Sequence, residues 1–206
     1  MEDFGFYLVM TNPTVGYAKC AEAAVKAGVK IVQLRMKHVP REEILREARE
    51  VRRITSGTQT LFIVNDDPDI ASEAEADGVH VGQDDLPPSE IRARYPDLRI
   101  IGLSTHNINQ TRASTSQPID YIGVGPVYAT PTKDIPDPTL GLDTMAEMVR
   151  LAKRPAVAIG GIDETRLPDV LKAGARNFAV VRAVCQSENP YDAIARLCDI
   201  ASKALP

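Results

Sequence analysis

Eight short apolar segments recur along the chain, and a helical or helix-like segment follows each of them. Most are continuous apolar runs, which is typical of parallel β-strands that are covered on both faces. The segments occupy Phe6–Met10, Ile31–Leu34, Leu61–Val64, Gly78–Val81, Ile100–Leu103, Tyr121–Gly123, Ala156–Ile159 and Phe178–Val181. Eight strands that alternate with helices favour a (β/α)8 TIM barrel. An open, doubly wound sheet stays as the alternative, because a sequence pattern cannot prove closure.

Helical periodicity supports the same architecture. Ile44, Leu45, Ala48 and Val51 recur at helical spacing, and a similar pattern covers residues 142–152. The Asn189-Pro190 pair predicts an N-cap followed by proline at the first position of the last helix.

The length and composition predict one domain over residues 1–206 in a soluble enzyme or binding protein. The chain has 206 residues with no linker or compositional break, and no apolar run reaches the ~20 residues of a membrane span. A net charge of −4 gives no general attraction to nucleic acid or to an anionic membrane. Three cysteines without CxxC spacing, and a start without a basic region, predict reduced thiols and a cytoplasmic location. The sequence leaves homo-oligomer formation open.

Polar side chains follow the second strand at alternating positions. Gln33, Arg35 and Lys37 would share one face, and residues at the carboxyl ends of barrel strands converge on one site. A solvated strand end with a salt bridge is the alternative. Two cations and an amide on one face favour an anion site slightly.

Acidic residues follow the third and fourth strands. Asn65 and Asp66 end the third strand, and Asp85 lies in the loop after the fourth. Each cluster precedes a proline, so helix capping is the better interpretation of either one alone. Two neighbouring carboxylates beside cations favour Mg²⁺, which binds few carboxylates together with water and substrate phosphate.

The segment Tyr121–Lys133 combines glycines with hydroxyls and a cation. Thr130, Thr132 and Lys133 follow the glycines, and this combination suits a phosphate group. An ordinary strand that ends in a polar turn explains the segment equally well.

The seventh and eighth strands end in a further glycine pair and a cation. Gly160, Gly161 and Arg182 occupy the positions that often bind phosphate in barrels, although a tight turn also explains the glycines.

Three other polar residues belong to the middle strands. Ser104 is expected either to bind substrate or to cap a helix, and His80 is expected to be a core histidine. His106 is a candidate general acid or base for which the sequence identifies no partner.

Six ordered motifs, spread over nearly the whole chain, resemble one known family. They are Gln33–Lys37, Asn65–Asp66, Gly78–Pro87, Gly102–Ser104, Gly123–Pro126 with Thr130–Lys133, and Ala158–Ile162. Together they resemble the thiamine-phosphate synthase family. The resemblance implies a (β/α)8 barrel that joins 4-amino-2-methyl-5-hydroxymethylpyrimidine diphosphate to a thiazole phosphate (a carboxylated form included) and releases pyrophosphate. In the implied mechanism pyrophosphate leaves before the thiazole nitrogen attacks.

The resemblance also implies roles for individual residues. The pyrimidine diphosphate would be held by Gln33, Arg35, Lys37, Asn65, Ser104 and Lys133. The thiazole phosphate would be surrounded by Thr130, Thr132, Gly160, Val181 and Arg182. Mg²⁺ would be bound by Asp66 and Asp85, and the catalytic candidates are Lys133 and Ser104. Arg182 departs from the serine that the family often has, which leaves the phosphate contacts open at this position.

Two rival functions remain at this point. A thiazole tautomerase of the same fold needs a proton shuttle, for which His106 is the candidate. A non-catalytic protein that binds thiazole or thiamine phosphate is the second rival. Neither needs the groups expected for diphosphate and Mg²⁺, so Lys37, Asp66, Asp85 and Lys133 favour the synthase. The proline-rich segment Asp134–Thr139 is expected to be a lid.

Overall fold

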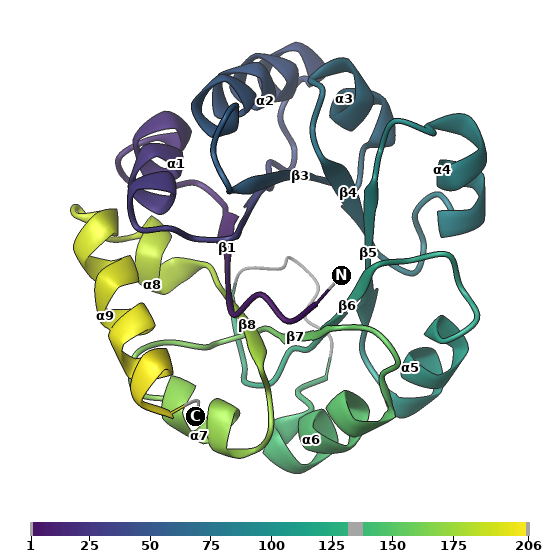
Figure 1. Cartoon of the computed structure of the whole chain (residues 1–206), viewed down its shortest axis with the longest axis vertical. Helices are drawn as coiled ribbons and strands as arrows, with labels where there is room; N and C mark the ends of the chain where they lie inside the picture. Colours follow the sequence, from purple (N-terminus) through teal and green to yellow (C-terminus); the bar gives the residue numbers. More distant parts are fainter. Residues whose placement is uncertain (1, 132–137, 205–206) are drawn as a thin grey trace.

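Eight parallel strands close into a barrel in which each strand pairs with the next and β8 pairs with β1 (Figure 1). The computed structural model describes residues 2–131 and 138–204. The strands are β1 (Phe6–Met10), β2 (Ile31–Leu34), β3 (Leu61–Asn65), β4 (Gly78–Val81), β5 (Ile100–Thr105), β6 (Tyr121–Val124), β7 (Ala156–Ala158) and β8 (Asn177–Val180). This closure confirms the TIM barrel and excludes the doubly wound alternative.

Helices surround the barrel on its outside (Figure 1). They are α1 (Tyr17–Lys26), α2 (Arg41–Thr55), α3 (Pro68–Glu73), α4 (Pro88–Arg94), α5 (Ile108–Ser114), α6 (Gly141–Leu151), α7 (Leu167–Lys172), α8 (Arg182–Cys185) and α9 (Pro190–Ala204). The periodicity of α2 is confirmed, because Leu45, Ala48 and Val51 are buried. The start of α9 is confirmed as well: the Asp192 N–H donates to Oδ1 of Asn189 over 3.3 Å.

The strand boundaries agree with the predicted ones to within two residues. The largest difference is at β5, which continues to Thr105 beyond the predicted end at Leu103. Ser104 therefore lies inside a strand, in register with Gly123 of β6. The helix-cap interpretation of Ser104 is wrong.

Alternation along the strands divides the buried residues into two groups. One group fills the barrel interior and consists of Tyr7, Val9, Ile31, Ile63, Ile100, Tyr121, Val157 and Ala179. The larger group packs between the strands and the helices. The segment before β1 crosses one opening of the barrel (Figure 1), where Phe4 makes edge-to-face contacts with Tyr7 and Tyr121. Aromatic packing thus closes the interior at this end.

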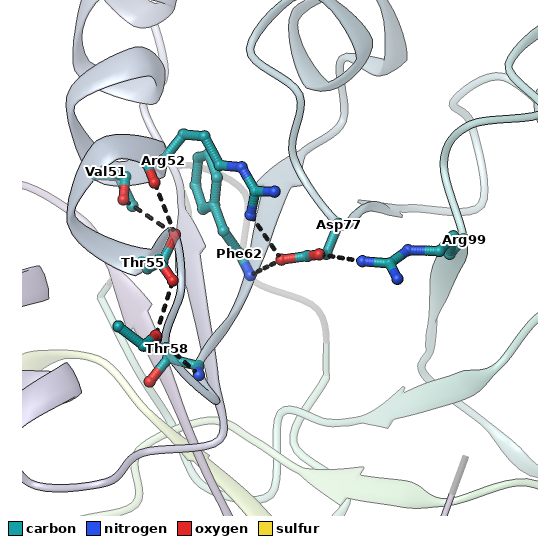
Figure 2. Close-up of polar contacts among 8 residues, drawn as sticks. Val51, Arg52, Thr55, Thr58, Phe62, Asp77 and Arg99 are labelled. Atoms are coloured by element: carbon teal, nitrogen blue, oxygen red, sulfur yellow. Dashed lines mark hydrogen bonds and ion pairs between the residues drawn. The ribbon is translucent and has the colours of Figure 1, made fainter.

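A buried carboxylate ties strands and helices together just before β4 (Figure 2). Asp77 is 6% exposed and accepts hydrogen bonds from the Phe62 N–H at 2.9 Å, from Arg99 at 2.6 Å and from Arg52 at 3.3 Å. Its charge is therefore compensated by two guanidinium groups and a backbone donor, as a buried charge requires. This contact joins α2, β3 and the start of β5 at the end of the barrel opposite the predicted site.

Within the described residues, no helix combines the length and the apolar character needed to cross a lipid bilayer. The cysteines are free thiols; Cys20 and Cys185 are buried, whereas Cys198 is half-buried on α9.

Candidate active site

A cavity of about 900 Å³ opens at the carboxyl ends of the strands. The predicted site residues that line it are Gln33, Arg35, Asn65, Ser104, Thr130, Gly160, Val181 and Arg182. Apolar side chains from β1, β7 and β8 complete its wall, among them Val9, Val157 and Ala179. The cavity therefore offers apolar walls and a few converging polar groups, which is typical of a small-molecule site.

Three predicted site residues in the described part of the chain do not line this cavity. Lys37, Asp66 and Asp85 lie beyond its lining, in the loops that follow β2, β3 and β4. Thr132 and Lys133 lie outside the described residues, and so do residues 134–137 of the expected lid.

The floor of the cavity is a continuous chain of hydrogen bonds. The Gln33 amide donates to the Tyr7 hydroxyl at 2.7 Å, and the hydroxyls of Tyr7 and Tyr121 are 2.8 Å apart. Nδ1 of His80 lies 2.9 Å from the Tyr121 hydroxyl, and its Nε2 lies 2.9 Å from Oγ of Ser104. Five residues from five strands thus form one polar network that is buried at Tyr7 and Tyr121 and partly buried at His80 and Ser104; we call it the floor network.

Sequence reasoning missed most of the floor network. Tyr7 and Tyr121 were given no individual role from the sequence, and His80 was expected to be a core histidine. His80 is indeed hydrogen-bonded on both ring nitrogens, but it also lines the cavity. The inward-facing glycines of neighbouring strands were a usable signal: a Cβ on Gly102 would lie 2.2 Å from Cζ of Tyr121 and 2.4 Å from Nδ1 of His80.

Burial keeps the two phenols of the network in their neutral form. Burial raises the pKa of Tyr7, although hydrogen bonds to Tyr121 and Gln33 partly oppose this effect. Burial also raises the pKa of Tyr121 well above its ordinary value, and the adjacent Tyr7 raises it further. Both side chains therefore act as hydroxyl donors and acceptors at neutral pH.

Two carboxylates lie beside each other at the ends of β3 and β4. Burial raises the pKa of Asp85, the Gly82 N–H lowers it from 2.7 Å, and the negative charge of Asp66 raises it again. The Lys37 ammonium contacts the Asp66 carboxylate. A divalent cation here would relieve the repulsion between the carboxylates.

The donor set fits Mg²⁺ better than a metal held by the protein alone. Among residues 2–131 and 138–204, no three histidine, cysteine or acidic side chains are grouped to hold a metal ion. Mg²⁺ commonly takes one or two carboxylates and fills its other positions with water and substrate phosphate. Asp66 and Asp85 suit such a site.

Of the neighbouring aspartates Asp66 and Asp67, Asp67 is the one that caps a helix. Asp67 caps α3, because its Oδ1 accepts from the Ile70 N–H at 2.9 Å. Asp66 has a left-handed backbone with φ of 63° and contacts Lys37 instead. Asp85 does not cap α4, whose N-cap residue is Pro87. The capping alternative is therefore wrong for Asp66 and for Asp85.

The loop after β7 packs tightly against the loop after β6. Gly160 has φ of 104°, and a Cβ at this position would lie 2.5 Å from Cα of Pro126. Its carbonyl accepts from the Tyr128 N–H at 3.0 Å. Only glycine satisfies both the backbone angle and the close approach.

A second arginine, which sequence reasoning missed, lies at this end of the cavity together with Arg182. Arg166 donates to the Gly161 carbonyl at 2.8 Å, and its guanidinium lies 4.9 Å from the centre of the Tyr128 ring. Arg182 is exposed and hydrogen-bonds Gln186 at 3.2 Å. Both arginines line the cavity and make this end cationic.

His106 also lines the cavity, on the loop after β5. Its Nδ1 lies 2.7 Å from the Gly125 carbonyl, which can only accept a hydrogen bond. Nδ1 therefore carries a hydrogen, and in the neutral imidazole Nε2 is the basic nitrogen.

Comparisons with known proteins agree with the barrel fold. A family model described as thiamine monophosphate synthase matches residues 6–184. The chain is 44% identical over 179 residues to a thiamine-phosphate synthase of Synechococcus sp. strain WH7803, covering 87% of this chain and 50% of the relative. It is 40% identical to the thiamine-phosphate synthase of Caldicellulosiruptor saccharolyticus, covering 87% of this chain and 81% of the relative.

A solved structure gives the same result. The thiamine phosphate pyrophosphorylase of Pyrococcus furiosus superimposes with a TM-score of 0.89 at 29% identity, over 99% of this chain and 98% of that one. The chain spans about half the length of several of the curated relatives that it matches, 50% for Synechococcus sp. strain WH7803 and 53% for Gloeobacter violaceus. The match over residues 6–184 and the agreement in fold establish that the chain belongs to the thiamine monophosphate synthase family.

Proposed function

We propose that this chain is a thiamine-phosphate synthase, a transferase of thiamine biosynthesis. It would join the aminopyrimidine diphosphate to the thiazole phosphate and release pyrophosphate. The observation that carries the proposal is the convergence of polar groups from five strands on one cavity with apolar walls. The reaction is expected in the cytoplasm, and its partners would be the two small-molecule substrates.

The pyrimidine would lie on the floor network, between apolar walls. Gln33, Asn65 and Ser104 offer amide and hydroxyl groups toward a heteroaromatic ring. Arg35 also lines the cavity, and Lys37 follows it in the loop after β2. These two cations would hold the diphosphate, with Lys133 assigned to the same group from the sequence.

Asp66 and Asp85 would hold Mg²⁺ next to the diphosphate. When bound, the ion would neutralise charge on the departing pyrophosphate. Lys37 contacts Asp66 and would keep this carboxylate oriented toward the mouth of the cavity.

The thiazole phosphate would occupy the opposite side, between the loops after β6, β7 and β8. Gly160 and Val181 provide backbone at this end, Thr130 provides a hydroxyl, and Arg182 provides positive charge. A phosphate in this position would direct the thiazole ring toward the pyrimidine.

The reaction breaks the bond between the pyrimidine methylene carbon and the diphosphate oxygen, and pyrophosphate departs with the electron pair. The thiazole nitrogen then forms a bond to the same carbon. This sequence needs two substrates held close together and charge neutralisation on the leaving group; it needs no protein nucleophile.

The direct test supplies the purified protein with both substrates and Mg²⁺ and measures pyrophosphate and thiamine phosphate. We expect equal amounts of the two products, and neither when any one component is omitted. If the thiazole phosphate binds but no product forms, the chain is not a synthase.

One observation keeps a thiazole tautomerase as the second candidate. His106 lines the cavity with a basic Nε2 in its neutral form, as a proton shuttle requires. A tautomerase would convert the thiazole phosphate isomers without the pyrimidine diphosphate or Mg²⁺. NMR of the thiazole phosphate incubated with protein alone separates the two activities.

A further inference from the structure

In the floor network, the Gln33 amide nitrogen can only donate a hydrogen bond, and each hydroxyl has a single hydrogen to donate. These limits determine which atom is the donor in each hydrogen bond of the network. The Gln33 amide nitrogen is a donor, and it lies 2.7 Å from the Tyr7 hydroxyl. The Tyr7 oxygen therefore accepts this bond and has one hydrogen left to donate. Among the described residues, the acceptor within reach of this hydrogen is the Tyr121 oxygen, 2.8 Å away.

The hydrogens of Tyr121 and His80 are determined in the same way. Because Tyr121 accepts from Tyr7, its own hydrogen goes to Nδ1 of His80 at 2.9 Å. A neutral imidazole that accepts at Nδ1 carries its hydrogen on Nε2. Nε2 then donates to Oγ of Ser104 at 2.9 Å.

The opposite direction leaves a buried donor unsatisfied. If Ser104 donated to His80, and His80 to Tyr121, the Tyr7 oxygen would accept from both Tyr121 and Gln33. Its own hydrogen would then have no acceptor within residues 2–131 and 138–204, although Tyr7 is only 2% exposed. A charged imidazolium, which donates at both nitrogens, produces the same defect, and buried donors without partners are strongly disfavoured.

We infer that the floor network runs in one direction, from Gln33 to Ser104, and that His80 is a positioning residue that presents the Ser104 hydroxyl as a hydrogen-bond donor to the ligand. Because Oγ of Ser104 already accepts from His80, its hydrogen is available to the cavity that Ser104 lines. A ligand that offers an acceptor at this point, such as an unprotonated ring nitrogen, would take this hydrogen. An aminopyrimidine has such nitrogens; this identification rests on the proposed function.

The local packing shows that the network has dedicated space. A Cβ on Gly102 would overlap both Tyr121 and His80, at 2.2 and 2.4 Å, and a Cβ on Gly123 would contact Cε1 of His80 at 3.4 Å. The His80 and Tyr121 rings also stack, with centroids 5.4 Å apart. Glycine on the next two strands, β5 and β6, thus leaves room for the His80 ring between Tyr121 and Ser104.

The first test reads the direction in the ligand-free protein. The chain has three histidines, so ¹⁵N-labelled histidine gives a small set of signals that single substitutions can assign. We expect the hydrogen of His80 on Nε2 at neutral pH, with Nδ1 unprotonated. The Tyr7→Phe variant should keep this tautomer, because Tyr121 still donates to Nδ1. A hydrogen on Nδ1 of His80 in the wild-type protein would overturn the inference.

The second test asks whether Tyr121 acts through Ser104. Titration calorimetry with the pyrimidine diphosphate and Mg²⁺, without the thiazole phosphate, compares Ser104→Ala, Tyr121→Phe and the double variant. Ser104→Ala should bind about tenfold more weakly, the equivalent of one lost hydrogen bond. The double variant should bind no more weakly than Ser104→Ala alone. Additive losses would contradict the positioning role.

The two tests separate the inference from the proposed function. The tautomer is measured without any substrate, so it stands or falls independently of the reaction. If His80 has the expected tautomer but the pyrimidine diphosphate does not bind, the proposed function fails and the network direction remains. If the protein turns over normally but the hydrogen of His80 is on Nδ1, the proposed function stands and the inferred direction of the network is wrong.

Discussion

The hydroxyl oxygens of Tyr7 and Tyr121 lie 2.8 Å apart inside the barrel, although 114 residues separate them in the chain. Both side chains are almost completely buried, and burial raises the pKa of each. The pair connects Gln33 on one side of the cavity floor to His80 and Ser104 on the other. The pair therefore links Gln33 and Ser104, two predicted substrate-binding residues that are far apart in the sequence.

The stability of the protein should fall steeply above pH 10 because of this pair. An unfolded tyrosine ionises near pH 10, whereas Tyr7 and Tyr121 keep their protons in the folded state. The unfolded state then binds fewer protons, so the free energy of unfolding decreases as pH rises. Each tyrosine should contribute a slope of about 1.4 kcal/mol per pH unit.

Urea denaturation between pH 9 and pH 11 measures this slope. Tyr7→Phe should make it shallower, by about 0.7 kcal/mol per pH unit on average over this range and by about 1.4 kcal/mol per pH unit at higher pH. Tyr191→Phe, which changes an exposed tyrosine on α9, serves as the control. Equal slopes for Tyr7→Phe and the wild-type protein would show that Tyr7 ionises as readily when folded as when unfolded.

Asp85→Ala should abolish most Mg²⁺-dependent activity and leave the fold intact. Burial and the charge of Asp66 already disfavour the ionised carboxylate, so its removal relieves repulsion. Loss of outer-shell partners typically weakens metal binding by about 10–100-fold, and a direct ligand should matter at least as much. Pyrophosphate release against Mg²⁺ concentration measures the effect.

Asp84→Ala is the matched control, since Asp84 is exposed and adjacent in the chain. The Asp84→Ala variant should show the wild-type Mg²⁺ dependence. Chelation by EDTA should stop turnover in this variant and in the wild-type protein. Wild-type turnover by Asp85→Ala would remove Asp85 from the metal site.

Asp77→Ala should destabilise the barrel without changing the activity of the folded fraction. The substitution leaves the buried Phe62 N–H without its acceptor and separates Arg52 and Arg99 from their shared carboxylate. We expect a loss of about 2–3 kcal/mol in the free energy of unfolding.

Chemical denaturation measures this loss, with Asp199→Ala as the control. Asp199 pairs with Lys203 on the exposed face of α9, and such surface pairs contribute about 0–1 kcal/mol. If Asp77→Ala and Asp199→Ala lower the free energy of unfolding equally, the buried Asp77 contacts contribute no more to stability than a surface pair.

Gly160→Ala should damage the phosphate end of the cavity more than Gly174→Ala, although the two glycines have almost the same backbone angle. Their φ values are 104° and 105°, so both substitutions carry a backbone cost of about 1–2 kcal/mol. Only the Gly160 Cβ meets a neighbour, Pro126, at 2.5 Å, whereas a Gly174 Cβ meets nothing within 4 Å. Unfolding free energies and thiazole phosphate binding should therefore separate the variants, and equal effects would mean that the clash is relieved without cost.

The hydrophobic pattern was enough to locate the elements of the barrel. Eight apolar runs gave eight strands with small boundary errors, because a buried parallel strand has a continuous apolar signal that depends on local sequence. The polar residues directly after these runs gave much of the candidate site. Residues 65–67 show the limit of this approach. Asn65 lines the cavity, Asp66 belongs to the carboxylate pair, and Asp67 caps α3. These three consecutive polar residues differ in role because their backbone angles differ.

The sequence by itself determined the order of strands and helices, the glycines at the strand ends and the residue types available for phosphate and Mg²⁺. Only the tertiary structure decided that the sheet closes, that Arg166 joins Arg182 at one end of the cavity, and that Tyr7 and His80 belong to the floor network. The physical reason is that sequence periodicity indicates on which face of a strand or helix a side chain lies, but not which other residues it contacts there. Contacts across the barrel depend on register and closure, which join residues from distant parts of the chain.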